Sequence, residues 1–561
     1  MIGTRYAPFA AVSGAMLLLV IVAPSKATPT ASAFPYMGPS GGPAASGAAS
    51  TLQPGQTPGA TGTAAPGATV QGSTGTGATG PGGGARAVAG GLAPGDTSHC
   101  VNGRQFGELA TAPPCTPHFV GNNGGATWTG VTGDSIKVIY YREKDNPAVA
   151  AIEQGAGLYS NPTDQQNFIV AANKFINGRY ELYGRKLSIE FYQGNCSPAP
   201  PDPACYRQDV DTLVSAKHPF AVIYDNNTNS PDFFDELSKL QTINWGGWHF
   251  ADSFDAQHRP WHWDVYTSGD YQAVETGEYW CNRLAGKPAR FAGDAALKTM
   301  TRKVAIVVPN YPTTMESAAH LQSIINNCAP NSAEIVAYSS DTSTATAQAT
   351  NDVAKERQDG VTSLLWFSDP IAPVYGTNAE SSQGYHPEEV LVGSGLLDYD
   401  VLAQLYSPDE WKHAFGPSDI QDQQPFSRTD AAIVWHAAGQ SGDPYSSANL
   451  PWSYFASVAY MLNQTGPTLN PGTFERAAFA GPWPDFWMLN HDASHPWLKW
   501  GPNPSAVGAY AGISDEREVY WDPGATSPAN GKQGAYKTLN GSARFRIGQW
   551  PHGEPDLPPG V

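Results

Sequence analysis

Three polar residues near the middle of the chain follow a short apolar segment and could bind an anion. Residues 220–224 read as a buried strand. The next polar side chains include Asn226, Asn227 and Thr228, and a Ser-Pro pair typical of a helix start comes soon after. Short polar side chains and backbone N–H groups at such a position form a site for a carboxylate or similar anion. The same residue types also end strands and cap helices, so a purely structural role is the alternative.

A second set of candidate ligand contacts lies after later strand-like segments. Its members are Tyr311, Thr313, Asp369, Asp398 and Tyr399. A carboxylate such as that of Asp369 or Asp398 could pair with a ligand amine. The alternatives are again local, because Tyr311 stands at a helix entry and Asp369 precedes a proline and could cap the next helix.

One segment superficially resembles a catalytic metal site. His491 and His495 stand four positions apart, as in the helical zinc motif HExxH, but Asp replaces the Glu and Pro496 follows. No nucleophile elbow, phosphate-binding loop or dinucleotide fingerprint stands at a strand–helix junction. We therefore expect a protein that is not an enzyme, with no catalytic residue, no metal and no cofactor. A secreted hydrolase with a metal near His491 is the least favoured alternative.

The candidate residues depend on strand–helix units to bring them together. Strand-like and helix-like segments alternate over residues 135–240, and the pattern restarts near residue 270 and runs to about residue 406. Such alternation predicts parallel sheets covered by helices on both faces. The two runs predict an α/β fold of two Rossmann-like lobes with parallel sheets joined by a hinge. Ligands of such sheets bind beyond the carboxyl ends of the strands, where the candidate residues stand.

Two further segments are distinctive. The loop over residues 142–161 follows the first strand, is long, and contains Gly155 and Gly157. Long loops at this end of a strand are often functional. Near the C-terminus, residues 519–522 and 543–546 are expected to pair as a hairpin across a long turn.

The N-terminal part of the chain reads as an export signal followed by a tether. Arg5 precedes an apolar run over residues 7–24, and small residues follow, which is a secretory pattern. We expect residues 1–33 to be a signal peptide or, if uncleaved, a signal anchor. Residues 34–98 are mostly Gly, Ala, Pro, Thr and Ser. They cannot bury enough apolar surface to fold and are expected to form a disordered tether.

Six cysteines fit export to an oxidising compartment. They stand as three pairs of near neighbours: Cys100 with Cys115, Cys196 with Cys205, and Cys281 with Cys328. An even number in an exported chain predicts disulfides, although the sequence leaves their connectivity open. The CxxC-like spacing of a zinc site is absent.

Charge and composition exclude some functions and set the expected domains. The 561-residue chain has a formal net charge of −18, with 32 basic against 50 acidic residues and no basic run, which argues against binding to nucleic acid. The part after the tether is long enough for two sizeable cores. We expect a first lobe over residues 99–268 and a second lobe over residues 269–440. Residues 441–561 are expected to return to the first lobe or the hinge and to end in loops and a hairpin.

Four segments and the order of the elements link the chain to a known family. The segments are GVTGDSIKV at residues 130–138, VSAK at 214–217, GEYWC at 277–281 and LAGKPARFAGD at 284–294. Over residues 130–466 the chain resembles type I periplasmic binding proteins of the branched-chain amino-acid transporter class, and the last segment resembles actinobacterial members. In that family the loop matching Asn226 to Thr228 gives donors to the ligand carboxylate, and an aromatic residue near the position of Tyr311 packs on the ligand.

The resemblance implies a function and a location. The two lobes would close on a ligand as a Venus flytrap does, so we expect an extracytoplasmic solute-binding protein that captures a small polar or amphipathic, amino-acid-like ligand for an ABC transporter. The alternative is a surface sensor or receptor with the same fold and no transport role. The expected partners are a small-molecule solute and an ABC permease, with the membrane reached only through an uncleaved N-terminus. The expected location is extracellular or at the cell surface.

Overall fold

The computed structural model describes residues 93–224, 230–247, 249–393, 395–481, 495–502 and 507–558. These residues belong to one of the two compact units of the chain, Ala87–Val561, the other being Met1–Arg86. Within the described ranges, no helix has the length and apolar character needed to cross a membrane. The expected signal segment, most of the expected tether, and Asn226, Asn227, Thr228 and His491 lie outside the described residues.

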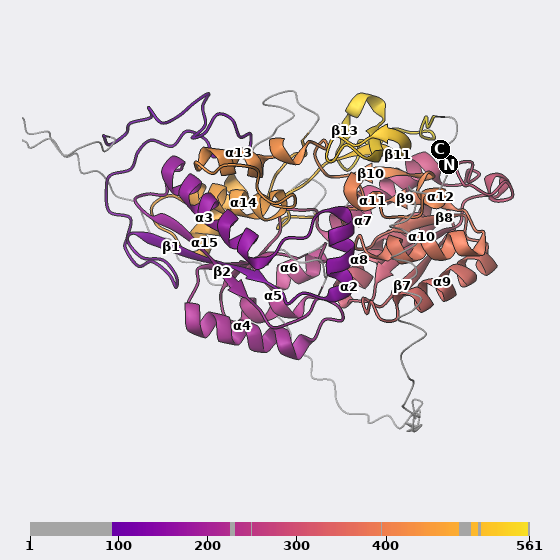
Figure 1. Ribbon diagram of the computed structural model, residues 1–561, viewed down its shortest axis with the longest axis horizontal. Coiled ribbons are helices and arrows are strands. Elements are labelled where there is room, and N and C mark those ends of the chain that lie inside the picture. Colours follow the sequence, from indigo (N-terminus) through magenta and orange to yellow (C-terminus); the bar gives the residue numbers. More distant parts are fainter. Residues whose placement is uncertain are drawn as a thin grey trace, which may run out of the picture. The chain divides into compact units, whose positions relative to one another are not determined.

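The first lobe is built on a five-stranded parallel sheet with the order β2-β1-β3-β4-β5. Its strands are β1 (Ser135–Arg142), β2 (Lys186–Gln193), β3 (Ala221–Tyr224), β4 (Ile243–Gly246) and β5 (His262–Trp263). The helices between them are α2 (Pro147–Ala156), α3 (Pro162–Arg179), α4 (Pro203–Lys217), α5 (Asp232–Lys239) and α6 (Asp252–Gln257). Strands β3 and β4 are buried along their whole length, as expected for a parallel sheet that is covered on both faces (Figure 1).

Several helices begin at the same short motif, an Asn or Asp followed by proline. The side chain of the first residue accepts hydrogen bonds from backbone N–H groups of the first turn, and the proline fits the first helical position because it needs no N–H donor there. The pairs are Asn146-Pro147 of α2, Asn161-Pro162 of α3, Asp202-Pro203 of α4 and Asn470-Pro471 of the later helix α15 (Pro471–Ala480). These caps fix where each helix starts relative to the strand before it.

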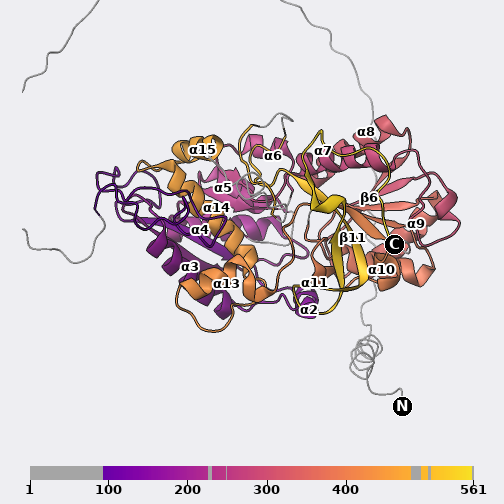
Figure 2. The ribbon, with the colours of Figure 1, turned by 90° about the horizontal axis from the view of Figure 1, so that it is seen from above.

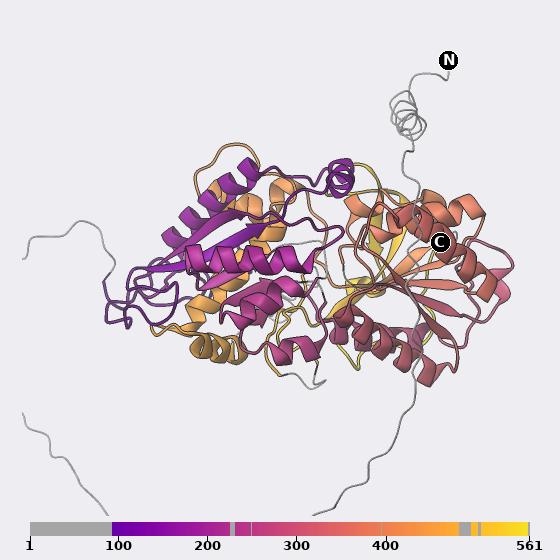
Figure 3. The same ribbon diagram turned by 90° about the horizontal axis from the view of Figure 1, so that it is seen from below.

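The second lobe has a larger sheet with the order β12-β11-β10-β9-β8-β6-β7. The parallel strands are β6 (Val304–Pro309), β7 (Ala333–Tyr338), β8 (Ser363–Trp366), β9 (Glu388–Leu391) and β10 (Ala414–Ser418). The helices are α7 (Gly269–Tyr279), α8 (Pro312–Cys328), α9 (Ala345–Asp359), α10 (Ala372–Gln383), α11 (Asp400–Ala403) and α12 (Pro408–Trp411). Figure 3 shows these helices on both faces of the sheet. The predicted fold class, two α/β lobes with parallel sheets, is confirmed.

The C-terminal strands extend the second sheet in antiparallel fashion. Strand β11 (Glu516–Thr526) pairs with β10 and with β12 (Gln533–Thr538). The prediction that residues 519–522 pair with residues 543–546 as a hairpin is wrong, because residues 519–522 pair with β12. The short strand β13 (Arg544–Phe545) pairs instead with the first two residues of β11.

Between the two lobes the chain crosses three times. After β5 it enters the second lobe at α7, and after β10 it returns to the first lobe. There α13 (Asp430–Ala437), α14 (Asn449–Thr465) and α15 join the apolar core of the first lobe (Figure 2). It then crosses once more to β11. Because α13 packs on the first lobe, the return begins before the boundary at residue 440 that the sequence suggested.

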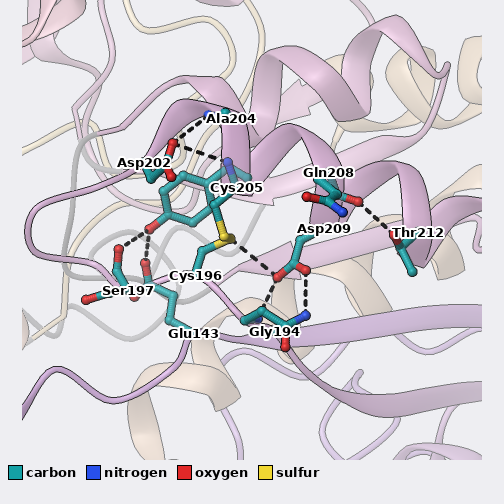
Figure 4. The surroundings of a disulfide bond; sticks show 12 residues. Glu143, Gly194, Cys196, Ser197, Asp202, Ala204, Cys205, Gln208, Asp209 and Thr212 are labelled. Atoms are coloured by element: carbon teal, nitrogen blue, oxygen red, sulfur yellow. Dashed lines mark hydrogen bonds between the residues drawn. A yellow bond between two sulfur atoms is a disulfide. The ribbon is translucent and has the colours of Figure 1, made fainter.

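The six cysteines form three disulfides, each between near neighbours in the sequence. The pairs are Cys100–Cys115, Cys196–Cys205 and Cys281–Cys328. The second of these closes the loop between β2 and α4. Figure 4 shows that this loop lies beside Glu143, which directly follows β1, and Asp209 of α4.

Candidate functional site

A cavity between the lobes lies at the carboxyl end of β1 in the first-lobe sheet. It has a volume of about 130 Å³ and is lined by residues of both lobes, and we call it the interlobe cleft. The first lobe contributes the end of β1 and much of the segment from Arg142 to Ser160, including one face of α2. The second lobe contributes Pro370 and Ile371, just before α10, together with Leu396 and Leu402. Ligands of parallel sheets bind at such strand ends.

Helix α2 forms one wall of the cleft and reaches the second lobe. It ends at Gly157, whose φ of 73° is the left-handed conformation that favours glycine. The following Leu158 and the last helical residue, Ala156, pack in one apolar cluster with second-lobe residues that include Leu396, Val401 and Leu402. The long loop expected over residues 142–161 is therefore a helix that bridges the two lobes (Figure 2).

The first-lobe rim of the cleft carries both signs of charge. Arg142 forms an ion pair with Asp145, with 2.6 Å between Nη2 and Oδ1, and donates a hydrogen bond to the carbonyl oxygen of Ser160 at 3.1 Å. Glu143 accepts a hydrogen bond from the Tyr206 hydroxyl at 2.6 Å. Lys144 is exposed at the same rim. A cleft with cationic and anionic groups side by side matches the charges of a zwitterionic solute.

Gln165, at the start of α3, offers an unused acceptor to the cleft. Its side-chain amide donates to Ser160 Oγ at 2.9 Å. Its Oε1 atom is buried and has no hydrogen-bond partner among the described residues, and the residue lines the cleft. A buried amide oxygen left unpaired costs roughly 1–3 kcal/mol. An N–H or O–H donor on a ligand would remove that cost.

A second cavity of about 170 Å³ adjoins the interlobe cleft. The two share Leu396, Ser447 and Leu450 as lining residues. The second cavity is walled by the large aromatic residues Trp452 and Trp500 together with the crossing segment near residue 420. It extends the space at the hinge and gives it an apolar, aromatic side.

The structure separates the residues predicted in the second lobe. Tyr399 lines the second cavity. Its neighbour Asp398 is 2 % exposed and accepts a hydrogen bond from Ser418 Oγ at 2.6 Å, so it lies behind the cavity wall. Burial raises the pKa of Asp398 above its usual range.

Tyr311 and Thr313 lie at the start of α8. Burial, together with the nearby carboxylates of Asp369, Glu143 and Asp232, raises the pKa of Tyr311 to about 12. Thr313 is buried in the first turn, and its hydroxyl has no hydrogen-bond partner among the described residues.

Asp369 is held by its own lobe. Its Oδ1 accepts hydrogen bonds from the backbone N–H groups of Ile371 and Ala372 at 2.8 and 3.1 Å. Its Oδ2 accepts from the Tyr338 hydroxyl at 2.5 Å. The residue therefore caps the turn that leads into α10, the alternative that the sequence had left open.

Arg142 and Gln165 are cleft residues that sequence reasoning did not single out. The only hint was the long segment over residues 142–161, which was expected to be functional as a whole. Gln165 follows that segment, and nothing in its type distinguishes it from the exposed Gln166 beside it.

Comparison with solved structures identifies the fold. A solute-binding protein of an ABC transporter from R. palustris, in complex with 4-hydroxybenzoate, aligns with 74% of this chain and 98% of its own at 12% identity and a TM-score of 0.50. The transporter substrate-binding protein LivJ from Streptococcus pneumoniae, in complex with isoleucine, aligns with 72% and 99% of the two chains at 12% identity and a TM-score of 0.47. No protein-family model matches the sequence, and neither does any curated protein. The fold is that of the type I periplasmic binding proteins.

Proposed function

We propose that this chain is an extracytoplasmic solute-binding protein that holds a small, amino-acid-like solute in the interlobe cleft and delivers it to an ABC transporter. The observation that carries this proposal is the cavity lined by both lobes at the carboxyl end of β1. The R. palustris solute-binding protein with a similar fold is bound to 4-hydroxybenzoate, which supports a small carboxylate as the ligand class.

The chemistry of the cleft favours a solute with one carboxylate and one donor group. Arg142 and Lys144 place positive charge at the rim, where a carboxylate could lie. The unpaired Oε1 of Gln165 would accept a hydrogen bond from the amine or hydroxyl of the same molecule. The aromatic side of the adjoining cavity would take an apolar side chain.

Binding would favour the closed arrangement of the lobes. A ligand shifts a conformational equilibrium only by its difference in affinity for the two states. A solute in contact with Gln165 of the first lobe and with Ile371 or Leu402 of the second would gain its full set of contacts only when the lobes are together.

Three disulfides support a location outside the cytoplasm, where such bonds persist. We propose that the N-terminal segment directs export. If the apolar segment stays uncleaved, the following tether would connect the lobes to the membrane near a permease.

A thermal-shift screen tests the binding proposal. Amino acids and hydroxybenzoates are added to the purified full chain, and a true ligand raises Tm in a concentration-dependent way. Calorimetry with the best ligand gives Kd. We expect Gln165→Ala to weaken binding about tenfold, or about 1.4 kcal/mol.

The neighbouring Gln166→Ala serves as the matched control, because Gln166 is exposed on the same helix, and its Kd should equal that of the wild type. The proposal fails if no small carboxylate in the screen raises Tm. It fails for this cleft if Gln165→Ala and Gln166→Ala bind the ligand equally well.

A further inference from the structure

Three glutamates that are distant in sequence meet inside the second lobe, away from the interlobe cleft. They are Glu380 of α10, Glu389 of β9 and Glu410 of α12, and each is 0 % exposed. One carboxylate oxygen from each lies within 4.8 Å of those of the other two. We call this group the glutamate cluster. Buried carboxylates at this separation repel one another strongly unless something neutralises them.

Hydrogen bonds from the described residues around the cluster reach only some of its carboxylate oxygens. The Trp366 indole donates to Glu389 Oε2 at 2.6 Å, and His386 Nδ1 lies 2.9 Å from both oxygens of Glu410. Both oxygens of Glu380 and Oε1 of Glu389 have no hydrogen-bond partner among the described residues. No ion pair between Glu380 or Glu389 and a Lys or Arg occurs within the same ranges.

A fourth buried carboxylate near the cluster also has an oxygen atom that no hydrogen bond satisfies. Glu356 of α9 is 2 % exposed, and its Oε2 has no hydrogen-bond partner among the described residues. Glu356 and Glu380 both line a cavity of about 80 Å³ under α9 and α10, two helices that lie side by side over the sheet (Figure 1). The cavity therefore has buried, unpaired carboxylate oxygens on its wall and room for a small ion.

We propose that Glu380, Glu389 and Glu410 bind a divalent cation of the Ca²⁺ class, with Glu356 as a further negative charge beside it. Carboxylate oxygens are the ligands that Ca²⁺ prefers, at about 2.3–2.6 Å. Two oxygens bound to one such ion are at most roughly 4.6–5.2 Å apart, so the limit of 4.8 Å within the cluster allows all three carboxylates to share an ion. Water in the adjoining cavity would complete the coordination shell.

Protons are the competing way to neutralise the cluster. Burial raises the pKa of Glu380, Glu389 and Glu410, and a proton shared between Glu380 and Glu389 raises the pKa of Glu380 further. His386 acts in the opposite direction on the pKa of Glu410. The cation must therefore displace protons, which leave the carboxyl groups for the buffer, so affinity should rise with pH. Other titratable groups near the cluster or its members are Glu356, Tyr385, His386, Asp294, Asp409 and Lys412.

The ion would connect three elements of the second lobe. Glu380 stands in the last turn of α10, Glu389 in β9, and Glu410 in the short helix α12 before β10. A cation there would hold α10 and α12 against β9, an interior strand of the second-lobe sheet. The cavity beside the cluster shares Val149, Pro198 and Ile371 with the interlobe cleft, so the metal titration is done without solute.

Metal binding to the full chain tests the proposal without any solute. The protein is treated with EDTA, dialysed, and titrated with CaCl₂ by calorimetry, with MgCl₂ and MnCl₂ in parallel. We expect one Ca²⁺ per chain, an increase in Tm with Ca²⁺, and release of protons, measured as a binding enthalpy that depends on the ionisation enthalpy of the buffer. Affinity should rise at least tenfold between pH 6 and pH 8.

Two variants locate the site. Glu380→Gln removes one charge with little change in shape, and we expect it to lose Ca²⁺ affinity at least tenfold while its Tm in EDTA stays equal to or above that of the wild type. Asp409→Asn is the control, because Asp409 is on α12 with a side chain that is 73% exposed. The proposal is overturned if none of the three ions binds or shifts Tm, which would leave protons as the neutralising charge. It is also overturned if Glu380→Gln and Asp409→Asn bind Ca²⁺ alike.

Discussion

Asp369 stands where a ligand contact and a helix cap are both chemically reasonable. Its carboxylate already accepts three hydrogen bonds, from Ile371, Ala372 and Tyr338. A buried carboxylate with this number of donors is stabilised without any ligand. The hydrogen bonds therefore account for the residue as a capping group.

Substitution of Asp369 measures that capping role. We expect Asp369→Ala to lower the free energy of unfolding by about 1–2 kcal/mol, because the turn into α10 loses its acceptor. Asp369→Asn keeps an acceptor oxygen and should recover most of the loss in urea denaturation. If Asp369→Asn is as stable as the wild type but loses solute affinity more than tenfold, the residue binds ligand and our interpretation is wrong.

The raised pKa of Glu356 predicts how the free energy of unfolding depends on pH. Burial, together with nearby Asp352 and Glu334, raises the pKa of Glu356 to about 8. The folded state therefore holds a proton that the unfolded state, with a pKa of about 4.3, releases first. The contribution of the Glu356 carboxyl to the free energy of unfolding is fully present below its pKa in the unfolded state. This contribution is lost as pH rises through about 8.

Replacing Glu356 by a residue that does not titrate should make the free energy of unfolding depend less on pH. In EDTA, we expect Glu356→Gln to lose less stability than the wild type between pH 5 and pH 8, by up to ~1.4 kcal/mol per pH unit. Urea denaturation at several pH values gives the slopes. Glu190→Gln is the control, since Glu190 is partly exposed, forms an ion pair with Lys217 and belongs to the first lobe. Equal slopes for Glu356→Gln and the wild type would contradict the assignment.

The sequence was a weak guide to individual site residues for a physical reason. A side chain becomes a ligand contact through neighbours that come from other elements, and sequence gives only its own element. The sequence was compatible with Asp369 as a ligand contact or as a helix cap, and only its hydrogen-bond donors in the structure distinguish the two roles. The glutamate cluster was not foreseen at all, because its three members belong to three elements and have no common spacing.

At the scale of elements, the disulfides differ in the length of chain they close. Cys281 lies in the π-helical turn Trp280–Leu284 after α7, and Cys328 is the last residue of α8. This pair spans 47 residues, whereas Cys196 and Cys205 span 9. Each disulfide lowers the entropy of the unfolded chain. The resulting stabilisation is about 4 kcal/mol for the longer loop and about 2.6 kcal/mol for the shorter.

Paired serine variants test this order. We expect the Cys281→Ser, Cys328→Ser double variant to lose more unfolding free energy than Cys196→Ser, Cys205→Ser, as measured by urea denaturation. The longer bridge joins α7 to α8, so the loss should appear in the transition of the second lobe. A larger loss in the variant with the shorter loop would show that contacts around that disulfide, such as those of Asp209, outweigh chain entropy.

Strands and helices with strong patterns could be predicted from sequence, and those with weak patterns could not. The continuous apolar run at residues 304–309 and the spacing of apolar residues in α3 both identified real elements. Helix α2 was expected to be loop, because Gly155 and Gly157 suggested irregular chain, although Gly157 in fact ends the helix. Strand β12 has no apolar alternation and forms because β11 offers it an edge.

At the scale of the whole molecule, the path between the lobes was the least predictable feature. Composition is similar on both sides of each crossing, so nothing marks the return at α13 before residue 440. What decides it is which core the apolar face of each helix completes, and Ala431 and Val434 complete that of the first lobe. The same logic makes α2 important, because its apolar end packs on the second lobe.

The contact of α2 predicts how the lobes stay together. Leu158 is 7 % exposed and packs with Leu396, Val401 and Leu402 across the cleft. Replacing a buried leucine by a small residue typically costs about 2–5 kcal/mol. Because the cluster joins the lobes, we expect Leu158→Ser to favour their separation, seen as a larger radius of gyration in small-angle scattering of the unliganded protein.

The matched control for this prediction is Val170→Ser on α3, where the native side chain is 62 % exposed. Its scattering profile should equal that of the wild type. If Leu158→Ser instead lowers unfolding stability with no change in scattering, Leu158 stabilises the first lobe rather than the closed arrangement. A flytrap also requires the two readouts to be linked: a variant that opens the lobes must bind its solute more weakly, since part of the binding free energy is then used to close them.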